Sequence, residues 1–535
     1  MRRIQSKIDT TSSTYLRNRE HNQKLVADLH ARQQAARHHR PARDIERLRK
    51  LNKLLVRERL DLLLDPGTPF LELSTLAACR AYDGEVPQAA AVCGIGVVSG
   101  REVMVVASDS SIKGGALYPH TVTKIVRALD IAIENRIPVV HLVDSAGAYL
   151  PAQSEIFPGK YGGGRCFRNQ CVLSGEGIPQ VAVVLGHCTA GGAYVPTLSD
   201  YSIIVRGTGA VFLGGPPLVK AATGEDVDAD ELGGADVHTR ISGTADYAVD
   251  SEAEGIALAR EIVGTLRRCA RAPHDYRDPE EPYYDPAELY GIIPDDIKKM
   301  FDIREIIARI VDGSLFHEFK PDYGSTLVCG YAFIWGYKVG ILGNNGVLFS
   351  EAARKAAQFM QLCDRDGVPL LFLHNITGFM IGREYEHDGI TKDGAKMIMV
   401  QANVRVPKIS VCVHASNGAG HYAMASAAWD PRFLFTWPNT RVSVMGAEQA
   451  AKTLAQIKVA ALKREGKVLN PEELAAVERQ VFEEYEGKSD CYYGTSEMWD
   501  DGVLDPVDTR NALGIALGVA LNNVPEVGRR GVLRI

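Results

Sequence analysis

Two distant stretches of the chain repeat one pattern, in which a short buried strand runs into a glycine-containing turn. The first is IPQVAVVLGHCTAGGAY, residues 178–194, and the second is VPKISVCVHASNGAGHY, residues 406–422. They align without a gap. The β-branched run behind the proline of each stretch predicts a strand, so the chain is expected to build the same strand-to-turn junction twice.

The aligned turns place Gly191 and Gly192 of the first stretch on Ala419 and Gly420 of the second. Glycine lets the backbone pass close to a ligand, and the N–H groups are expected at the positive end of the helix that follows. Two such N–H groups directed at one oxygen form an oxyanion hole, which stabilises enolate charge without an ionising side chain. The alternative for a single glycine pair is a tight helix–strand contact, and its repetition in both halves favours the anion site.

The repeat extends beyond these turns. REVMVVASDS is echoed by GYKVGILGNN, and residues 137–151 (IPVVHLVDSAGAYLP) are echoed by residues 368–382 (VPLLFLHNITGFMIG). A repeat of this length indicates two copies of one β/α fold rather than a solenoid of short units. The chain of 535 residues is also too long for one compact core.

The predicted organisation has four parts. Residues 1–65 read as a helical arm that stops at the DPG sequence, and residues 66–271 form the first domain. Residues 272–299 are rich in proline, acid and tyrosine without periodicity, which is typical of a linker, and residues 300–535 form the second domain.

Charge and hydropathy narrow the function class. The net charge of −6 combines +10 over residues 1–60 with −16 over the remainder. A solvated helical arm is the favoured interpretation of the basic segment over a phosphate or partner surface, and the acidic body argues against nucleic acid. No apolar run reaches the length of a membrane span, and the N-terminus lacks the apolar core of a signal peptide. A cytoplasmic bacterial protein is expected, and the mitochondrial matrix stays open.

Cysteine and histidine patterns give no metal prediction. The ten cysteines include no C-x-x-C pair, which favours reduced core cysteines over zinc ribbons or disulfides. His187 and His414 at strand ends are expected to be satisfied core or loop histidines. Ser416, near His414 and His421, is a weak candidate for a nucleophile because the first copy has Cys188 there with another histidine spacing. A hydratase would need two acidic side chains beside the turn, and neither turn carries one.

The chain resembles the carboxyltransferase β subunits of biotin-dependent acyl-CoA carboxylases over almost its whole length, in the branch that acts on geranyl-CoA and 3-methylcrotonyl-CoA. The matching strings are RERLDLLLDPGTPFLELS, VDSAGAYLPAQSEIFP, CTAGGAYVP, GPPLVKAATGE, LGGADVH, NNGVLFSEAA, NITGFM and DDGVLDPVDTR. The resemblance implies an α/β fold of two tandem crotonase-like domains with an N-terminal helical arm. It also implies a homo-hexamer whose active site lies between the first domain of one subunit and the second domain of another.

The resemblance assigns one ligand to each copy. The acyl-CoA thioester oxygen is expected at Gly191 and Gly192, and the ureido oxygen of carboxybiotin at Ala419 and Gly420. The acyl-CoA is expected to contact Lys113, Gly114, Gly115, Ala116, Ser145, Ala146, Gly147 and Gly163. The biotin is expected to contact Asn344, Asn345, Thr377, Gly378 and Phe379. The implied reaction carboxylates the γ carbon of an α,β-unsaturated acyl-CoA and needs no side-chain base.

The cofactor is expected to come from another chain. The sequence has no ATP-grasp half and no A-M-K-M biotin-attachment sequence; the AKM of residues 395–397 lies in a predicted helix. The resemblance therefore implies a separate α subunit that carries biotin and the ATP-dependent carboxylase, in an α6β6 complex. No metal is expected in this chain.

Departures from the family pattern point to the acyl group. Propionyl-type subunits have an acid where Tyr422 stands, and methylcrotonyl-type subunits usually have phenylalanine where KYGGGRCF has Gly163. Asn417 also replaces an aromatic residue common at the second turn. Loss of a benzyl group opens room in a pocket wall, which favours geranyl-CoA over 3-methylcrotonyl-CoA unless the three glycines merely form a flexible loop. The rival classes are a biotin-dependent decarboxylase component of a membrane pump and a non-enzymatic assembly subunit.

Overall fold

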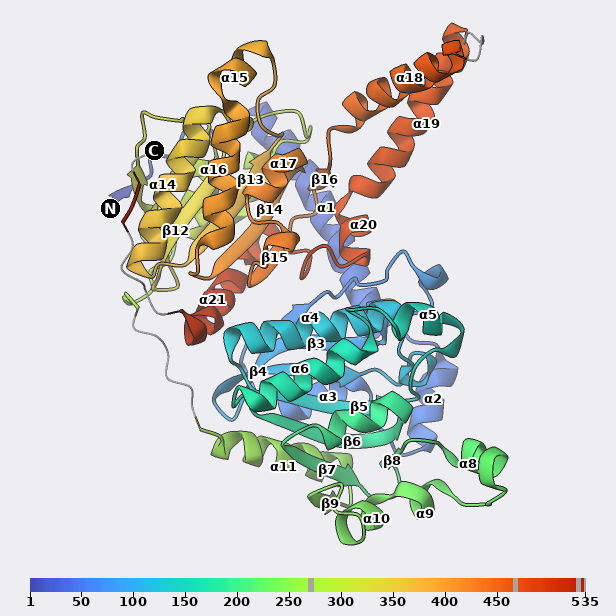
Figure 1. Cartoon of the computed structure of the whole chain (residues 1–535). Helices are drawn as coiled ribbons and strands as arrows, with labels where there is room; N and C mark the ends of the chain where they lie inside the picture. The colour runs from blue at the N-terminus through green and yellow to red at the C-terminus, as the bar shows by residue number, and fades with distance from the viewer. Residues whose placement is uncertain (268–273, 465–469, 526–530, 534–535) are drawn as a thin grey trace. The chain divides into compact units, whose positions relative to one another are not determined.

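The computed structural model describes the chain except for residues 268–273, 465–469, 526–530 and 534–535 (Figure 1). Two compact units make up the described chain, each built on one β-sheet. The first-sheet unit contains residues 32–271 and 496–498, and the second-sheet unit contains residues 1–31, 272–495 and 499–535. The first two residues of the predicted linker and Cys269 lie outside the described residues.

The first sheet has the strand order β2-β3-β4-β5-β6-β7-β9, with β8 beside the end of β6. The strands β2, β3 and β4 pair antiparallel, whereas β4 to β7, β8 and β9 pair parallel. Parallel strands are covered on both faces, which explains the continuous apolar runs of β5 and β6. The strands are β2 (Leu71–Leu73), β3 (Ala91–Val98), β4 (Arg101–Ser108), β5 (Val139–Ser145), β6 (Gln180–Thr189), β7 (Tyr201–Val205), β8 (Ala210–Phe212) and β9 (Tyr247–Val249).

The second sheet repeats this topology. Its order is β1-β10-β11-β12-β13-β14-β15, with β16 beside the end of β14, and the pairing from β12 onward is parallel. The strands are β1 (Arg2–Arg3), β10 (Leu315–Phe319), β11 (Leu327–Ile334), β12 (Tyr337–Asn344), β13 (Leu370–Ile376), β14 (Lys408–Asn417), β15 (Phe433–Thr436) and β16 (Arg441–Ser443). The register shifts at equivalent places, between Val143 and Ser145 in β5 and between His374 and Ile376 in β13. The predicted duplication is therefore confirmed down to an irregularity in one strand.

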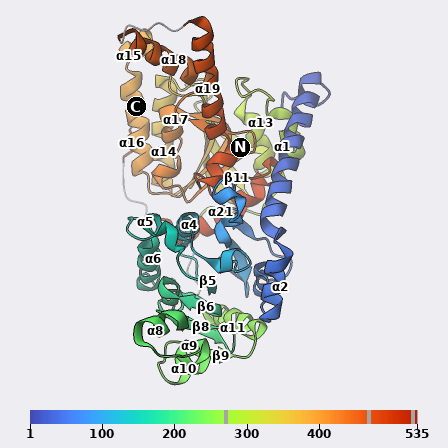
Figure 2. The same cartoon turned by 90° about the vertical axis from the view of Figure 1, so that its right-hand side faces the viewer.

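Helices cover both faces of each sheet. In the first-sheet unit α4 and α6 lie side by side on one face, and α3 and α11 pack on the other with the main apolar core (Figure 1). Figure 2 shows α8, α9 and α10 gathered near β8 and β9. The helices are α2 (Ala42–Lys50), α3 (Val56–Leu63), α4 (Pro119–Asn135), α5 (Gln153–Ile156), α6 (Gly163–Gly175), α7 (Tyr194–Thr197), α8 (Pro216–Thr223), α9 (Ala229–Gly233), α10 (Ala235–Arg240) and α11 (Glu252–Thr265).

In the second-sheet unit α14 and α16 pack side by side over the core, and α18 and α19 form a hairpin that extends away from the sheet of this unit (Figure 1). Helix α1 (Ser13–His38) contributes residues to both units. The other helices are α12 (Leu289–Ile292), α13 (Ile303–Ile310), α14 (Ser350–Asp366), α15 (Arg383–Asp388), α16 (Ile390–Asn403), α17 (Gly418–Ala423), α18 (Ala447–Arg464), α19 (Pro471–Ser489), α20 (Cys491–Ser496) and α21 (Thr509–Ala520). None of the helices in the described part of the chain combines the length and the apolar character that a bilayer span requires.

The prediction of a solvated basic arm holds for Arg43 and Arg49, which are exposed, and is wrong for Arg40 and Arg59. Arg40 is 5% exposed and pairs with Asp109 at 2.8 Å, and Arg59 is 1% exposed and pairs with Glu252 at 2.7 Å. The acidic excess of the first-sheet unit supplies these partners, so the opposite charges seen in the sequence neutralise each other inside the fold. The domain limits predicted at residues 65, 271 and 299 stay a prediction.

Candidate active site in two equivalent turns

The first turn follows β6. Gly191 and Gly192 lie in the 3-10 turn Ala190–Ala193, ahead of α7. N–H groups in the first turn of a helix have no intrahelical acceptor, so both amides are available to a ligand. Gly191 is exposed and Gly192 is buried, yet a Cβ built on Gly192 would meet no atom within 4 Å. Neither its backbone dihedrals nor its neighbours demand glycine at 192, and the open space beside its amide can hold part of a ligand.

The loops predicted to bind the acyl-CoA come together at this turn. The Ser145 hydroxyl donates to the Gly115 carbonyl at 2.7 Å and accepts from the Gly147 N–H at 3.2 Å. The Ala146 N–H donates to the Gly114 carbonyl at 3.1 Å. Ser145 therefore joins the loop that follows β4 to the loop that follows β5.

A cavity of about 370 Å³ lies between these strand ends, a size common for small-molecule sites. Its lining includes Gly114, Ser145, Ala146 and Thr189, so it reaches all three predicted strand ends. A second cavity, of about 680 Å³, has Lys113 at its wall. Its other basic lining residues are Arg32, His39, Arg40, Arg43 and Arg47.

An ion-pair network that the sequence reasoning missed supports the first cavity. Asp144 accepts from Lys53 at 2.9 Å, from Arg59 at 3.1 Å and from the Ser110 hydroxyl at 2.7 Å. Burial alone would raise the pKa of Asp144, but Arg59 and Lys53 hold it below its usual value. The network fixes the end of β5 against the N-terminal segment. The only sign of this network in the sequence is the charge asymmetry, which does not identify which basic and acidic residues pair.

Gly163 lies at the start of α6 and not in the predicted loop. A Cβ there would be 3.7 Å from the Ile156 carbonyl oxygen, an ordinary contact, and its φ is unstrained. Four residues later on the same helix face, Phe167 lies 3.5 Å from a Cβ built on Gly191. Gly163 therefore belongs to the helix face that covers the first turn, and the fold itself does not require glycine at this position.

The second turn begins α17 directly after β14. Ala419 and Gly420 are in its first turn, with N–H groups that have no intrahelical acceptor. As in the first turn, the first residue is exposed and the second is buried. Here the fold does demand glycine, because a Cβ on Gly420 would lie 2.6 Å from Cγ1 of Ile376 and 3.3 Å from Cα of Gly378. The predicted residue Gly378 thus borders the second turn.

The other residues predicted to bind biotin differ in what their atoms contact. The Leu348 N–H donates to the Gly378 carbonyl at 3.0 Å and Leu348 forms a bridge with Phe379, which brings the loop after β12 to the loop that contains Thr377. Asn344 is buried and neither side-chain amide atom has a hydrogen-bond partner. Asn345 instead accepts the Ile303 N–H at 2.8 Å, so its side chain holds the start of α13.

The predicted helix follows each turn, but both helices are short. The element after Gly192 is the four-residue α7, and α17 has six residues. A dipole grows with the number of aligned peptide units, so helices this short add little field. The capacity to hold an anion rests on the individual N–H groups.

Ser416 does pair with histidine, although not with His414. Its hydroxyl lies 2.9 Å from Nδ1 of His374 and 2.8 Å from Nδ1 of His421, while Nδ1 of His414 faces Asn439 at 3.0 Å. Burial lowers the pKa of His421 to about 4 and, with the neighbouring His421 charge, the pKa of His374 well below its usual value. Ser416 is fully buried, which disfavours a nucleophile that a substrate must reach.

Comparisons with known proteins identify the family. The family model for the carboxyl transferase domain matches residues 47–530. The chain belongs to the carboxyl transferase domain family. The predicted family is therefore confirmed.

Similar carboxyl transferase domain proteins share most of their length with this chain. The probable methylcrotonoyl-CoA carboxylase beta chain of Drosophila melanogaster, described as mitochondrial, is 49% identical over 99% of this chain and 95% of its own. The biotin-dependent 3-methylcrotonyl-coenzyme A carboxylase beta1 subunit of Mycobacterium tuberculosis is 49% identical over 96% and 98%. The relatives therefore include one described as mitochondrial and one from a bacterium.

A solved structure confirms the fold class. The crystal structure of the P. aeruginosa geranyl-CoA carboxylase beta subunit has a TM-score of 0.89 to this chain, with 44% identity and complete coverage of both chains. The two-sheet α/β architecture with a helical N-terminal segment is thus that of a carboxyltransferase β subunit.

Proposed function

We propose that this chain is the carboxyltransferase β subunit of a biotin-dependent acyl-CoA carboxylase that carboxylates the γ carbon of a branched, α,β-unsaturated acyl-CoA. The observation that carries the proposal is the pair of equivalent turns, each with two amides that have no intrahelical acceptor. Relatives named as methylcrotonoyl-CoA and geranyl-CoA carboxylase β subunits support the substrate class.

On the acyl side, Gly191 and Gly192 would hold the thioester oxygen while enolate charge develops on it. Amides already in place need no reorganisation as the charge forms, which lowers the barrier. The cavity bordered by Gly114 and Ala146 would take the chain next to the thioester. The cavity that contains Lys113 and five further basic residues would take the phosphates of CoA.

On the biotin side, the residues fit a neutral cyclic urea. Ala419 and Gly420 offer two backbone donors to its oxygen, and the unpartnered amide of Asn344 lies in the same unit. When bound, carboxybiotin supplies the carboxyl group and the base, and this chain supplies position, hydrogen-bond donors and exclusion of water. Gly378 borders the turn, and with its chain neighbours Thr377 and Phe379 it would complete this half.

Geranyl-CoA is the substrate we favour over 3-methylcrotonyl-CoA, because of Gly163. The fold does not require glycine there. Gly163 lies on the same face of α6 as Phe167, which contacts the first turn. A missing side chain at this place leaves room for a longer acyl group. Overall identity to relatives with either substrate is similar and does not decide the choice.

The proposed assembly is a homo-hexamer of this chain with a biotin-bearing α subunit, in which each active site combines the first turn of one subunit with the second turn of another. The test is incorporation of labelled bicarbonate by the chain reconstituted with its α subunit, with ATP and acyl-CoAs of increasing length. We expect geranyl-CoA to give the highest kcat/KM. A complex that accepts 3-methylcrotonyl-CoA and refuses geranyl-CoA would contradict the substrate, and one that carboxylates no acyl-CoA would contradict the function.

A further inference from the structure

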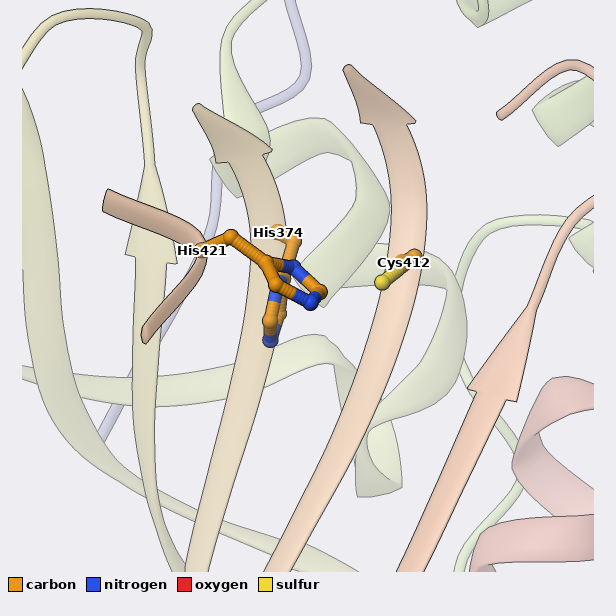
Figure 3. A group of neighbouring side chains, drawn as sticks. All are labelled: His374, Cys412 and His421. Atoms are coloured by element: carbon orange, nitrogen blue, oxygen red, sulfur yellow. The ribbon is translucent and has the colours of Figure 1, made fainter. Parts of the chain in front are cut away.

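A cluster of three metal-ligand side chains lies directly behind the second turn. Among the described residues, His374, Cys412 and His421 each offer one ligand atom, and these atoms lie within 4.8 Å of one another. Figure 3 shows the Cys412 side chain pointing toward the two imidazole rings. Imidazole nitrogen and cysteine sulfur are both ligand types that zinc binds in proteins.

The fold itself brings these residues together. His374 and Cys412 are directly paired in the register of β13 and β14, so their side chains share one face of the sheet. His421 comes from α17, one residue after Gly420. The cluster therefore joins two central strands to the helix that carries Ala419 and Gly420.

The hydrogen bonding of the cluster is incomplete. His374 is fully buried, and Nε2 of its ring has no hydrogen-bond partner. A buried polar atom without a partner costs free energy, so this ring has one nitrogen to spare. Ser416 contacts Nδ1 of both rings and is placed as the outer partner that orients ligand histidines in metal sites.

We propose that His374, Cys412 and His421 form a binding site for a borderline-soft divalent cation, such as Zn²⁺ or Co²⁺, which ties α17 to β13 and β14. In tetrahedral zinc coordination neighbouring N and S ligands are about 3.4 to 3.6 Å apart, so the ligand atoms move together by about 1 Å. Binding forms two metal–nitrogen bonds and one metal–sulfur bond in place of water ligands of the cation, leaves one water as the fourth ligand, and releases the Cys412 thiol proton to solvent. The cation would hold the second turn in one position against the sheet.

The test is titration of the purified full chain, stripped of metal by a chelator, with Co²⁺ alone. We expect one Co²⁺ per chain, a thiolate-to-cobalt charge-transfer band in the near ultraviolet, and displacement of the band by Zn²⁺. Excess Zn²⁺ should raise the unfolding midpoint by about 5 °C, because a ligand of the folded state stabilises it. The measurement uses no carboxylation step, so its failure leaves the proposed function untouched.

Variants locate the site. Cys412→Ser should abolish the band, and His421→Gln should weaken Co²⁺ binding by more than about 100-fold, whereas Ser416→Ala, an outer partner, should weaken it by about 10-fold to 100-fold. Cys363→Ala, a buried thiol in the same unit, and Cys171→Ser, an exposed thiol, should both keep the band. Absence of the band in the wild-type chain, or its survival in folded Cys412→Ser, would overturn the proposal and leave a hydrogen-bond cluster centred on Ser416.

Discussion

Glycine occurs at the two turns and at residue 163 for different physical reasons, and only the structure distinguishes these reasons. Gly420 is required by the close approach of Ile376, whereas Gly192 and Gly163 have space for a side chain. In the sequence all three look alike. A glycine that the fold does not need is the better indicator of a ligand, since nothing else in the chain explains it.

At Gly163, replacement by phenylalanine should narrow the substrate range. We expect Gly163→Phe to lower kcat/KM for geranyl-CoA at least about tenfold and to affect 3-methylcrotonyl-CoA much less, because even one methylene more or less in a pocket changes specificity by about 10-fold to 200-fold. Gly164→Phe is the matched control, since Gly164 is exposed and contacts nothing within 4 Å. Unchanged turnover of geranyl-CoA by Gly163→Phe would refute the proposal that Gly163 lines the acyl pocket.

At Asp500, burial raises the pKa of the carboxyl group to about 7. The unfolded chain ionises this group near pH 4, so the contribution of Asp500 to stability falls as pH rises from about 4 to 7 and falls no further above that range. Asp500→Asn should therefore be more stable than the wild type by up to about 4 kcal/mol at pH 8, and by much less at pH 4. Urea unfolding at several pH values measures this, with exposed Asp366→Asn as the control; an equal effect at pH 4 and pH 8 would contradict it.

At the scale of elements, the repeated strand and turn could be predicted because each depends on local backbone preference. The helix after each turn could be predicted too, but its length could not, since the length is set by what packs beyond it. Short helices α7 and α17 leave the proposed anion binding to separate amides rather than to a dipole. The geometry of each turn therefore predicts how an alanine substitution there changes stability and activity.

Gly192→Ala and Gly420→Ala should differ in what they damage. Gly420→Ala forces Ile376 aside and should lower the free energy of unfolding by about 1 to 3 kcal/mol. Gly192→Ala places a methyl group in open space, so we expect stability within about 0.5 kcal/mol of the wild type and a carboxylation rate at least about tenfold lower. Thermal unfolding beside labelled-bicarbonate incorporation checks both; a destabilised Gly192→Ala with normal activity would refute the proposed acyl site.

At the scale of the whole molecule, the N-terminal residues are part of the second-sheet unit. The Ser6 hydroxyl donates to Glu305 at 2.7 Å and the Lys7 N–H donates to Glu305 at 2.8 Å. Glu305 also accepts from Arg309, which is 1% exposed. The N-terminal residues therefore belong to the unit that is built mainly from the second half of the sequence.

Loss of Glu305 should destabilise this unit. Glu305→Ala leaves the Arg309 guanidinium buried with one partner fewer, and breaking a buried pair typically costs about 3 to 5 kcal/mol; Glu288 remains as a partner of Arg309, so we expect the lower end. Denaturant unfolding followed by far-UV circular dichroism gives the change. Glu20→Ala, which removes an exposed pair with Lys24, should leave the midpoint where it is, and an equally small effect of Glu305→Ala would show that the N-terminal contact is dispensable.

The sequence by itself determined the duplicated strand and turn pattern, and with it the fold class and the place of the two candidate oxyanion holes, because hydrophobic periodicity and glycine position are local properties. Tertiary structure decided the rest. The pairing of Arg40 and Arg59 with acids, and the meeting of His374, Cys412 and His421, depend on strand register and helix docking between residues far apart in the chain. A residue's neighbours across a sheet are fixed by that register and not by its own neighbours in sequence, so no local pattern could have named them.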